Sequence, residues 1–108
     1  MLTKEYITEL KKNSSAEIAN LIKNQKDVGT VNFILENLGH IPANFESDFL
    51  YELLEHSHAQ VRLNAVKNIG KLNGKTDVAK LTQLFKNETD TSVRREIISE
   101  KSLFITFN

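Results

Sequence analysis

The chain has 108 residues, of which 40% are hydrophobic and 26% are charged, so it suits one folded domain and is too apolar to be disordered. Its 14 basic and 14 acidic residues cancel, which excludes the strong net field of many proteins that bind nucleic acid or anionic membranes. It contains no cysteine, which excludes disulfides, zinc–thiolate sites and thiol catalysis.

The first residues predict an amphipathic helix rather than a targeting segment. Apolar side chains recur at helical spacing before a predicted end near Asn13, at Leu2, Tyr6, Ile7 and Leu10. No run of apolar residues in the chain reaches the length of a signal-peptide core or a membrane span. We therefore expect a cytoplasmic protein with no membrane contact, in which residues 1–13 form a capping helix.

Two more helices are predicted before Pro42, which keeps its own surroundings out of helix. Ser14 begins S-S-A-E, a capping box in which the serine hydroxyl accepts from the backbone N–H of Glu17. Asp27 is the predicted cap of the next helix, and Gly39 is its predicted end. The two apolar stripes are Ile18, Leu21 and Ile22, and then Val31, Ile34, Leu35 and Leu38.

The second half shows a short helix, a polar turn and another helix, twice over. Ser57 begins a second predicted capping box, Asn73-Gly74 is a predicted stop, and Asp90 is a predicted cap. The apolar stripes of the four helices are Phe49, Leu50, Leu53 and Leu54; Val61, Ala65, Ile69 and Leu72; Val78, Leu81, Leu84 and Phe85; and Val93, Ile97 and Ile98.

The most informative feature is an internal repeat. The Val-Arg pair at 61–62 recurs at 93–94, a separation of 32 residues. E-N-L-G at 36–39 matches K-N-I-G at 67–70, a separation of 31 residues. On this register three residues are equivalent cap positions: Asp27, His58 and Asp90. A repeat of this length with one helix pair per unit predicts a stack of helix pairs.

The string L-L-E-H-S-H-A-Q-V-R-L-N-A-V-K-N-I-G-K-L at residues 53–72 resembles the HEAT-repeat family, in particular bacterial repeats similar to the phycobilisome-lyase type. The resemblance is strongest over 46–98 and weaker over 14–39. It implies an all-α, right-handed α-α superhelix of the HEAT/armadillo-like solenoid kind, with about seven helices in three pairs plus the N-terminal helix. It also divides the chain after residue 13 into a divergent repeat at 14–39, the best-matched repeat at 46–73 and an incomplete last repeat at 76–108.

The resemblance further implies that the second helix of each pair lines the inner face, and that aspartates and arginines of neighbouring repeats form a structural ladder. Carried over by position, the ladder consists of Asp27, Arg62, Asp90 and Arg94, and Arg62 approaches Asp90 or Asp27. We interpret these charges as stabilising the fold rather than binding a ligand, because a partly buried ion pair orders a turn.

No catalytic or metal motif is present. His56 and His58 are two residues apart, which is not the i, i+4 spacing of a helical metal pair, and His40 has no carboxylate or cysteine at ligand spacing. The acidic residues are scattered singly among lysines. We therefore predict no catalytic residue, no metal site and no cofactor. A lyase-like enzyme, suggested only by the branch that the repeats resemble, is the remaining enzymatic alternative.

A partner-binding groove is predicted on the polar side of the helix after residue 58. Between Arg62 and Lys86 six basic residues face one acid, Asp77. The register places an acidic or neutral residue beside each inner-face base, so no continuous basic track is built, and nucleic acid is a weaker hypothesis than a protein partner. The predicted groove residues are Asn64, Lys67, Asn68, Lys71, Glu36 and Asn37.

The tail S-L-F-I-T-F is apolar and uncharged, whereas a repeat array needs polar ends. Either the last helix continues and buries Leu103 and Phe104, or the chain is part of a longer array, which we favour, or the tail self-associates. The predicted function is a non-enzymatic scaffold for protein–protein interaction, as a module of a larger protein. The alternative is an accessory nucleic-acid-binding module attached to a DNA-acting enzyme, for example a modification or repair enzyme.

Overall fold

Helices follow one another along the chain with short connections. The computed structural model describes residues 2–42, 44–72 and 77–104, with side chains up to residue 100. Within this part the chain forms seven α-helices and one 3₁₀ turn: α1 (Lys4–Asn13), α2 (Ser15–Lys23), α3 (Val28–Glu36), α4 (Asp48–Glu52), η1 (Leu53–Glu55), α5 (Ala59–Ile69), α6 (Val78–Asn87) and α7 (Thr91–Phe104). The predicted all-α class and helix number are confirmed.

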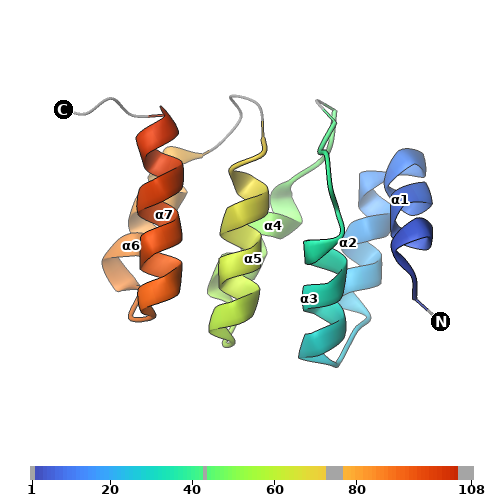
Figure 1. Cartoon of the computed structure of the whole chain (residues 1–108), viewed down its shortest axis with the longest axis horizontal. Helices are drawn as coiled ribbons and strands as arrows, with labels where there is room; N and C mark the ends of the chain where they lie inside the picture. Colours follow the sequence, from blue (N-terminus) through green and yellow to red (C-terminus); the bar gives the residue numbers. More distant parts are fainter. Residues whose placement is uncertain (1, 43, 73–76, 105–108) are drawn as a thin grey trace.

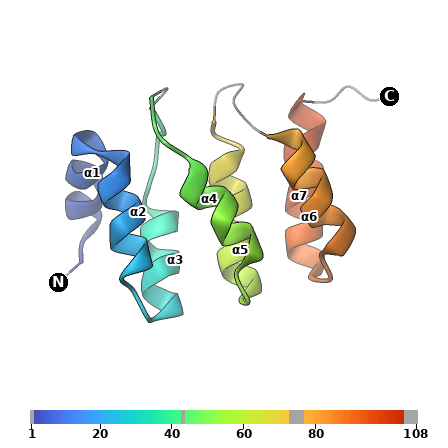
Figure 2. The ribbon, with the colours of Figure 1, turned by 180° about the vertical axis from the view of Figure 1, so that it is seen from behind.

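The helices form two layers that run along a body of 45 × 28 × 17 Å. Helices α3, α5 and α7 lie side by side in one layer, and α2, α4 and α6 lie behind them (Figure 1). The view from behind shows the second layer in front (Figure 2). Helix α1 packs against α2 at the N-terminal end of the stack. The stack of helix pairs that the repeat predicted is therefore present.

Helix α5 lies at the centre of the fold because it packs against α3, α7, α4 and η1. Val61, Ala65 and Ile69, one predicted apolar stripe, are completely buried, and Val66 joins them. Burying a side chain of this size contributes about 1.5–3 kcal/mol, so this stripe is a main source of stability. Fully buried residues on the other helices include Ile7, Ile18, Ile34, Leu50, Leu81, Val93 and Ile97.

The repeat register is visible at the helix starts. Asp27 accepts from the backbone N–H of Thr30 at 3.0 Å to cap α3, and Asp90 accepts from that of Val93 at 3.1 Å to cap α7. His58 is the N-cap residue of α5, although its side chain makes no capping hydrogen bond. The equivalence of Asp27, His58 and Asp90 is therefore confirmed, because each directly precedes the second helix of its pair.

Three local predictions need correction. Helix α5 starts after His58, so Ser57 lies one residue too early to cap it. Ser14 accepts from Ala16 at 3.1 Å rather than from Glu17, whose N–H donates to the Ser14 carbonyl. Helix α3 ends at Glu36, and Gly39 takes a left-handed conformation with φ 64° in the linker that follows. Caps depend on the backbone angles of a single residue, which explains errors of a few positions.

The backbone of α7 continues to Phe104, in agreement with a helix that runs into the apolar tail. The Asn73-Gly74 stop and the last tail residues, 105–108, lie outside the described part of the chain. No described helix is both long enough and apolar enough to cross a lipid bilayer.

Candidate functional site

An ion pair joins the two best-matched repeats. Arg62 on α5 donates from Nε and Nη2 to the two carboxylate oxygens of Glu88, both at 2.8 Å, and from Nη1 to the carbonyl of His56 at 2.7 Å. The Glu88 side chain is 2% exposed and that of Arg62 17%. Their hydrogen bonding lowers the pKa of Glu88 and raises that of Arg62. This buried bidentate pair fixes the α6–α7 turn on α5.

The predicted ladder residues occupy related but different places. Asp90 lies close enough to contribute to the raised pKa of Arg62, yet the carboxylate that Arg62 binds is Glu88, two residues earlier. Asp27 binds Thr30 of its own helix. Arg94 makes the same backbone contact as Arg62: each arginine donates from Nη1 to the carbonyl six residues before it. For Arg94 this is the carbonyl of Glu88, at 3.0 Å. It also stacks on the Phe85 ring, 4.1 Å from its centroid.

Two of the predicted groove residues are buried within the fold. Asn64 donates to Asn32 at 2.8 Å and to Glu36 at 3.3 Å, both on α3. Asn68 donates to the carbonyl of Leu35 at 3.0 Å, and only 2% of it is exposed. These amides therefore hold α5 to α3. Sequence reasoning placed them on the correct helix face but could not show that α3 covers them.

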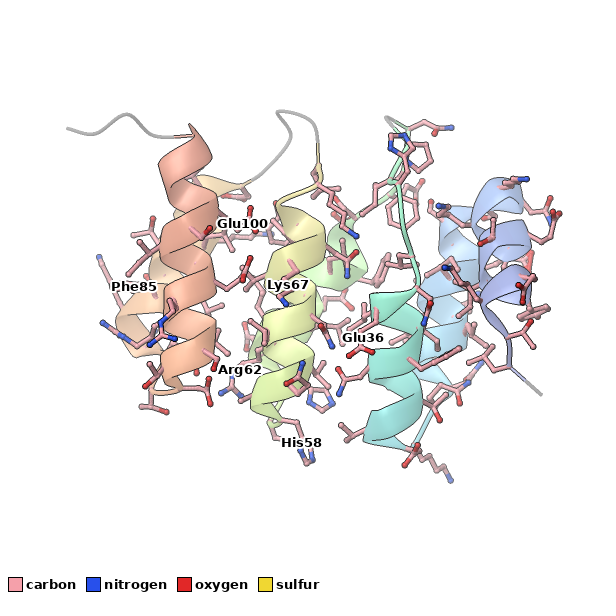
Figure 3. The ribbon with its side chains drawn as sticks, in the orientation of Figure 1. Glu36, His58, Arg62, Lys67, Phe85 and Glu100 are labelled. Atoms are coloured by element: carbon pink, nitrogen blue, oxygen red, sulfur yellow. The ribbon has the colours of Figure 1, made fainter. Side chains whose placement is uncertain are left out.

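The charged groove residues remain exposed on the layer of α3, α5 and α7, named here the α3–α5–α7 face. Glu36 and Lys67 lie on neighbouring helices of this face (Figure 3). Lys71 is also exposed, and its ammonium donates to the carbonyl of Gly39 at 3.3 Å. Asn37 donates to the carbonyl of Phe33 at 2.8 Å. The structure thus brings Glu36 and Lys67 to one surface and assigns Asn64 and Asn68 to inter-helix contacts.

Two carboxyl groups of α7, those of Glu96 and Glu100, lie close together, and Glu100 reaches the end of the neighbouring helix α5. The Glu100 carboxyl group packs directly on Gly70, so closely that a Cβ atom at residue 70 would overlap it. Burial, together with the hydrogen bond and charge of Glu96, raises the pKa of Glu100 to about 7. Sequence reasoning identified Gly70 as part of the repeat but did not connect it with Glu100.

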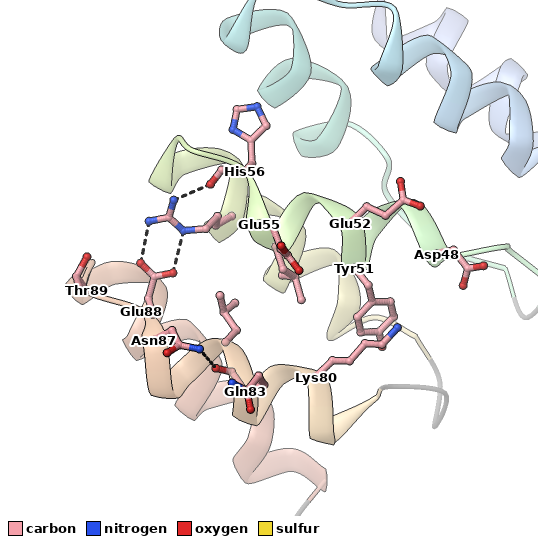
Figure 4. A pocket seen from close by; sticks show the side chains of 13 residues that line it. Asp48, Tyr51, Glu52, Glu55, His56, Lys80, Gln83, Asn87, Glu88 and Thr89 are labelled. Carbon is pink, nitrogen blue, oxygen red and sulfur yellow. Dashed lines mark hydrogen bonds and ion pairs between the residues drawn. The ribbon is translucent and has the colours of Figure 1, made fainter.

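A groove on the opposite side of the molecule separates α4 and η1 from α6 (Figure 4). Its volume is about 1010 Å³. Thirteen residues line it: Asp48, Tyr51, Glu52, Leu54, Glu55, His56, Arg62, Lys80, Gln83, Leu84, Asn87, Glu88 and Thr89. We call this feature the α4–α6 groove. The sequence-based hypothesis did not include it, because it depends on the spacing of two helices that are far apart in the chain.

The histidines take part in the turn before α5. The backbone N–H of His58 donates to Nδ1 of His56 at 3.0 Å, and the two rings lie 5.6 Å apart. Burial and the neighbouring His58 and Arg62 lower the pKa of His56, so its imidazole is neutral at pH 7. Among the residues described, no three histidine or acidic side chains converge as metal ligands would.

The basic residues between Arg62 and Lys86 do not form one patch. Arg62 is paired with Glu88, Lys71 faces the linker after α3, and Lys80 lies over the ring of Tyr51 at 5.0 Å. Lys75 lies outside the described residues. The excess of basic charge in the sequence is therefore divided between opposite sides of the fold.

Comparison with known proteins identifies the repeat family. A family model described as HEAT repeats matches residues 33–100, which is more than half of the chain. No curated protein and no solved structure matched the sequence.

Proposed function

Because the chain belongs to the HEAT-repeat family, we propose that it is a non-enzymatic scaffold that binds a protein partner through its α3–α5–α7 face. HEAT repeats generally serve as protein-interaction scaffolds. The observation that supports this face is that its exposed charges rest on a rigid support. Glu36 and Lys67 protrude from helices that buried Asn64 and Asn68 lock together. A surface held in this way loses little entropy on binding.

The chemistry of the face favours a protein over nucleic acid. It offers the carboxylate of Glu36 and the ammonium of Lys67 on neighbouring helices (Figure 3). Helix α3 also carries Phe33, three residues before Glu36, which is 38% exposed. Mixed charge beside an aromatic ring is typical of a protein interface, whereas a phosphate backbone requires a basic track. The partner is therefore expected to carry complementary charges of both signs.

A charge swap tests the proposal without changing net charge. We expect the variant Glu36→Lys/Lys67→Glu to lose a protein that the wild-type chain retains from an extract of its source cells. The swap Glu9→Lys/Lys12→Glu on α1 is the matched control, because this ion pair is 3.7 Å long and more than half exposed. Retention of the same partner by both variants would contradict the proposal.

The nucleic-acid alternative has a separate outcome. Short DNA and RNA duplexes are titrated with the wild-type chain at low and moderate salt, because phosphate binding weakens steeply as salt increases. If the duplexes bind tightly and salt-dependently, and Lys67→Glu abolishes this binding, then nucleic acid rather than a protein is the ligand of the α3–α5–α7 face.

A further inference from the structure

The α4–α6 groove lies on the layer opposite the α3–α5–α7 face and is not used by the function proposed above. Helix α5 packs against both α3 and α7 in its own layer, whereas a groove separates α4 from α6 in the other layer (Figures 2 and 4). At about 1010 Å³ it is large enough for several side chains of another polypeptide.

The apolar residues that line the groove, named here its floor, are Leu54, Leu84 and the ring of Tyr51. Leu54 is 5% exposed, Leu84 is partly buried, and the ring of Tyr51 is held by a 2.6 Å hydrogen bond from the backbone N–H of Asp77 to its hydroxyl oxygen. One end is closed by the Arg62–Glu88 pair (Figure 4). This floor favours an occupant with an apolar side chain and gives it a rigid surface to cover.

One wall of the groove is acidic. Asp48, Glu52 and Glu55 follow one another along α4 and η1, and all three are exposed. None of them has a cation within 4.0 Å among the residues that the structure describes. Lys80 lies on the facing wall, and its ammonium is placed over the Tyr51 ring, 5.0 Å from the ring centroid. Within the described part of the chain, therefore, no cation lies within ion-pair distance of this acidic wall.

The opposite wall is neutral apart from Lys80. Gln83 and Asn87 on α6 line it, and the Asn87 amide already donates to the Gln83 carbonyl at 3.2 Å. Arg62 and Glu88 neutralise each other at the closed end. The groove as a whole thus has excess negative charge on one side, polar amides on the other, and an apolar floor.

We propose that the α4–α6 groove binds a basic peptide segment of another protein. Its lysine or arginine side chains face Asp48, Glu52 and Glu55, and an apolar side chain covers Leu54 and Leu84. Negative charge on the wall repels nucleic acid, and a simple polyamine has no group for the apolar floor. The proposal is independent of the partner of the α3–α5–α7 face, because the two surfaces lie on opposite layers.

The test uses a fluorescein-labelled peptide of alternating arginine and leucine, with fluorescence anisotropy as the readout. The groove variant is Asp48→Asn/Glu52→Gln/Glu55→Gln, which keeps side-chain shape on exposed positions. The control variant is Glu5→Gln/Glu9→Gln/Glu17→Gln, which removes the same charge from exposed positions on α1 and α2. Equal unfolding midpoints for all three proteins show that the fold is retained.

We expect the groove variant to bind the peptide about tenfold more weakly than wild type, since each exposed ion pair contributes a few tenths of a kcal/mol to 1 kcal/mol. The control variant should bind within about twofold of wild type. A second readout locates the peptide: Tyr6→Phe leaves Tyr51 as the sole tyrosine, and its fluorescence should change on binding.

Three results would overturn the proposal. Equal weakening in both triple variants would mean that the peptide responds only to net charge. Binding that leaves Tyr51 fluorescence unchanged would place the peptide elsewhere. Concentration-dependent dimerisation of the wild type, abolished in the groove variant, would identify a second copy of this chain as the occupant. Loss of partner binding through Glu36 and Lys67 leaves these results unaffected, so the two hypotheses fail separately.

Discussion

Removing Arg62 should destabilise the fold more than any other single change to an exposed or partly exposed charge. The change Arg62→Ala deletes two 2.8 Å bonds to Glu88 and one of 2.7 Å to the His56 carbonyl. It leaves a carboxylate that is 2% exposed without its cation. Breaking a buried pair in this way costs about 3–5 kcal/mol.

We expect the lower end of this range, about 3 kcal/mol, because the Glu88 carboxylate still accepts from the backbone, including the N–H of Asp90 at 3.0 Å. The change Glu88→Gln leaves Arg62 unpaired, but the arginine is 17% exposed and can reach water, so about 1.5–2 kcal/mol is expected. A domain of this size has about 5–15 kcal/mol of stability, so both variants still fold.

The assay is a double-mutant cycle measured by urea unfolding, with helical circular dichroism as the signal. The coupling energy between Arg62 and Glu88 should be about 2 kcal/mol at neutral pH. The same cycle on the exposed Glu9–Lys12 pair serves as control and should give at most about 0.5 kcal/mol. Equal coupling in the two cycles would refute the reasoning that burial gives the Arg62 pair its strength.

The dependence on pH gives an independent check. Arg62 lowers the pKa of Glu88, so the pair's contribution is fully present above the ordinary value of 4.5 and is lost as pH falls through the lowered value. In Arg62→Ala the desolvated carboxyl has a raised pKa instead, and the variant gains stability as Glu88 takes up a proton. The difference between wild type and variant should therefore be largest at neutral pH and shrink as pH falls through the ordinary value of 4.5 and below it.

Three further predictions concern Glu100, Gly70 and Gly39. Glu100→Gln should stabilise the protein by roughly 1 kcal/mol at about pH 8 and have little effect near pH 4. The reason is that the pKa of Glu100 is raised to about 7, so ionisation of its carboxyl costs stability as pH rises, and solvent screening reduces this cost. Urea unfolding at both pH values measures the difference from wild type, and a difference that does not change with pH would contradict the prediction. Gly70→Ala should displace the Glu100 carboxyl into solvent and bring its pKa down toward the ordinary range, as followed by carbon NMR titration; an unchanged titration would show that the contact is unimportant. Gly39→Ala should cost about 1 kcal/mol in thermal unfolding, because alanine rarely adopts φ 64°, and no loss would mean that the linker rearranges freely.

Much of the fold could be predicted from spacing alone. The apolar stripe Val61, Ala65 and Ile69 is buried as expected, and the repeat register placed Asp27 and Asp90 directly before α3 and α7. These features are local: a helix face repeats every three to four residues, and a cap bonds to an amide two or three residues away. A single sequence contains all the information that such contacts need.

The contacts between helices could not be predicted from spacing. The partner of Arg62 is Glu88 rather than Asp90. The repeat pattern does not distinguish these two acidic residues, because the position equivalent to Glu88 in the preceding repeat holds His56, which is not acidic. Asn64 has the polarity of a surface residue and is buried because Asn32 on α3 offers its amide oxygen.

The candidate surfaces differ in the same way. The repeat register alone predicts that Glu36 and Lys67 occupy equivalent positions on neighbouring helices, because they begin the matched strings E-N-L-G and K-N-I-G. The α4–α6 groove lies between two helices that begin about thirty residues apart in the chain. Their separation in space depends on how both pack on α5 and on the Arg62–Glu88 pair. Helical periodicity specifies which side chains point inward, whereas the spaces left between helices depend on how all the buried side chains fit together.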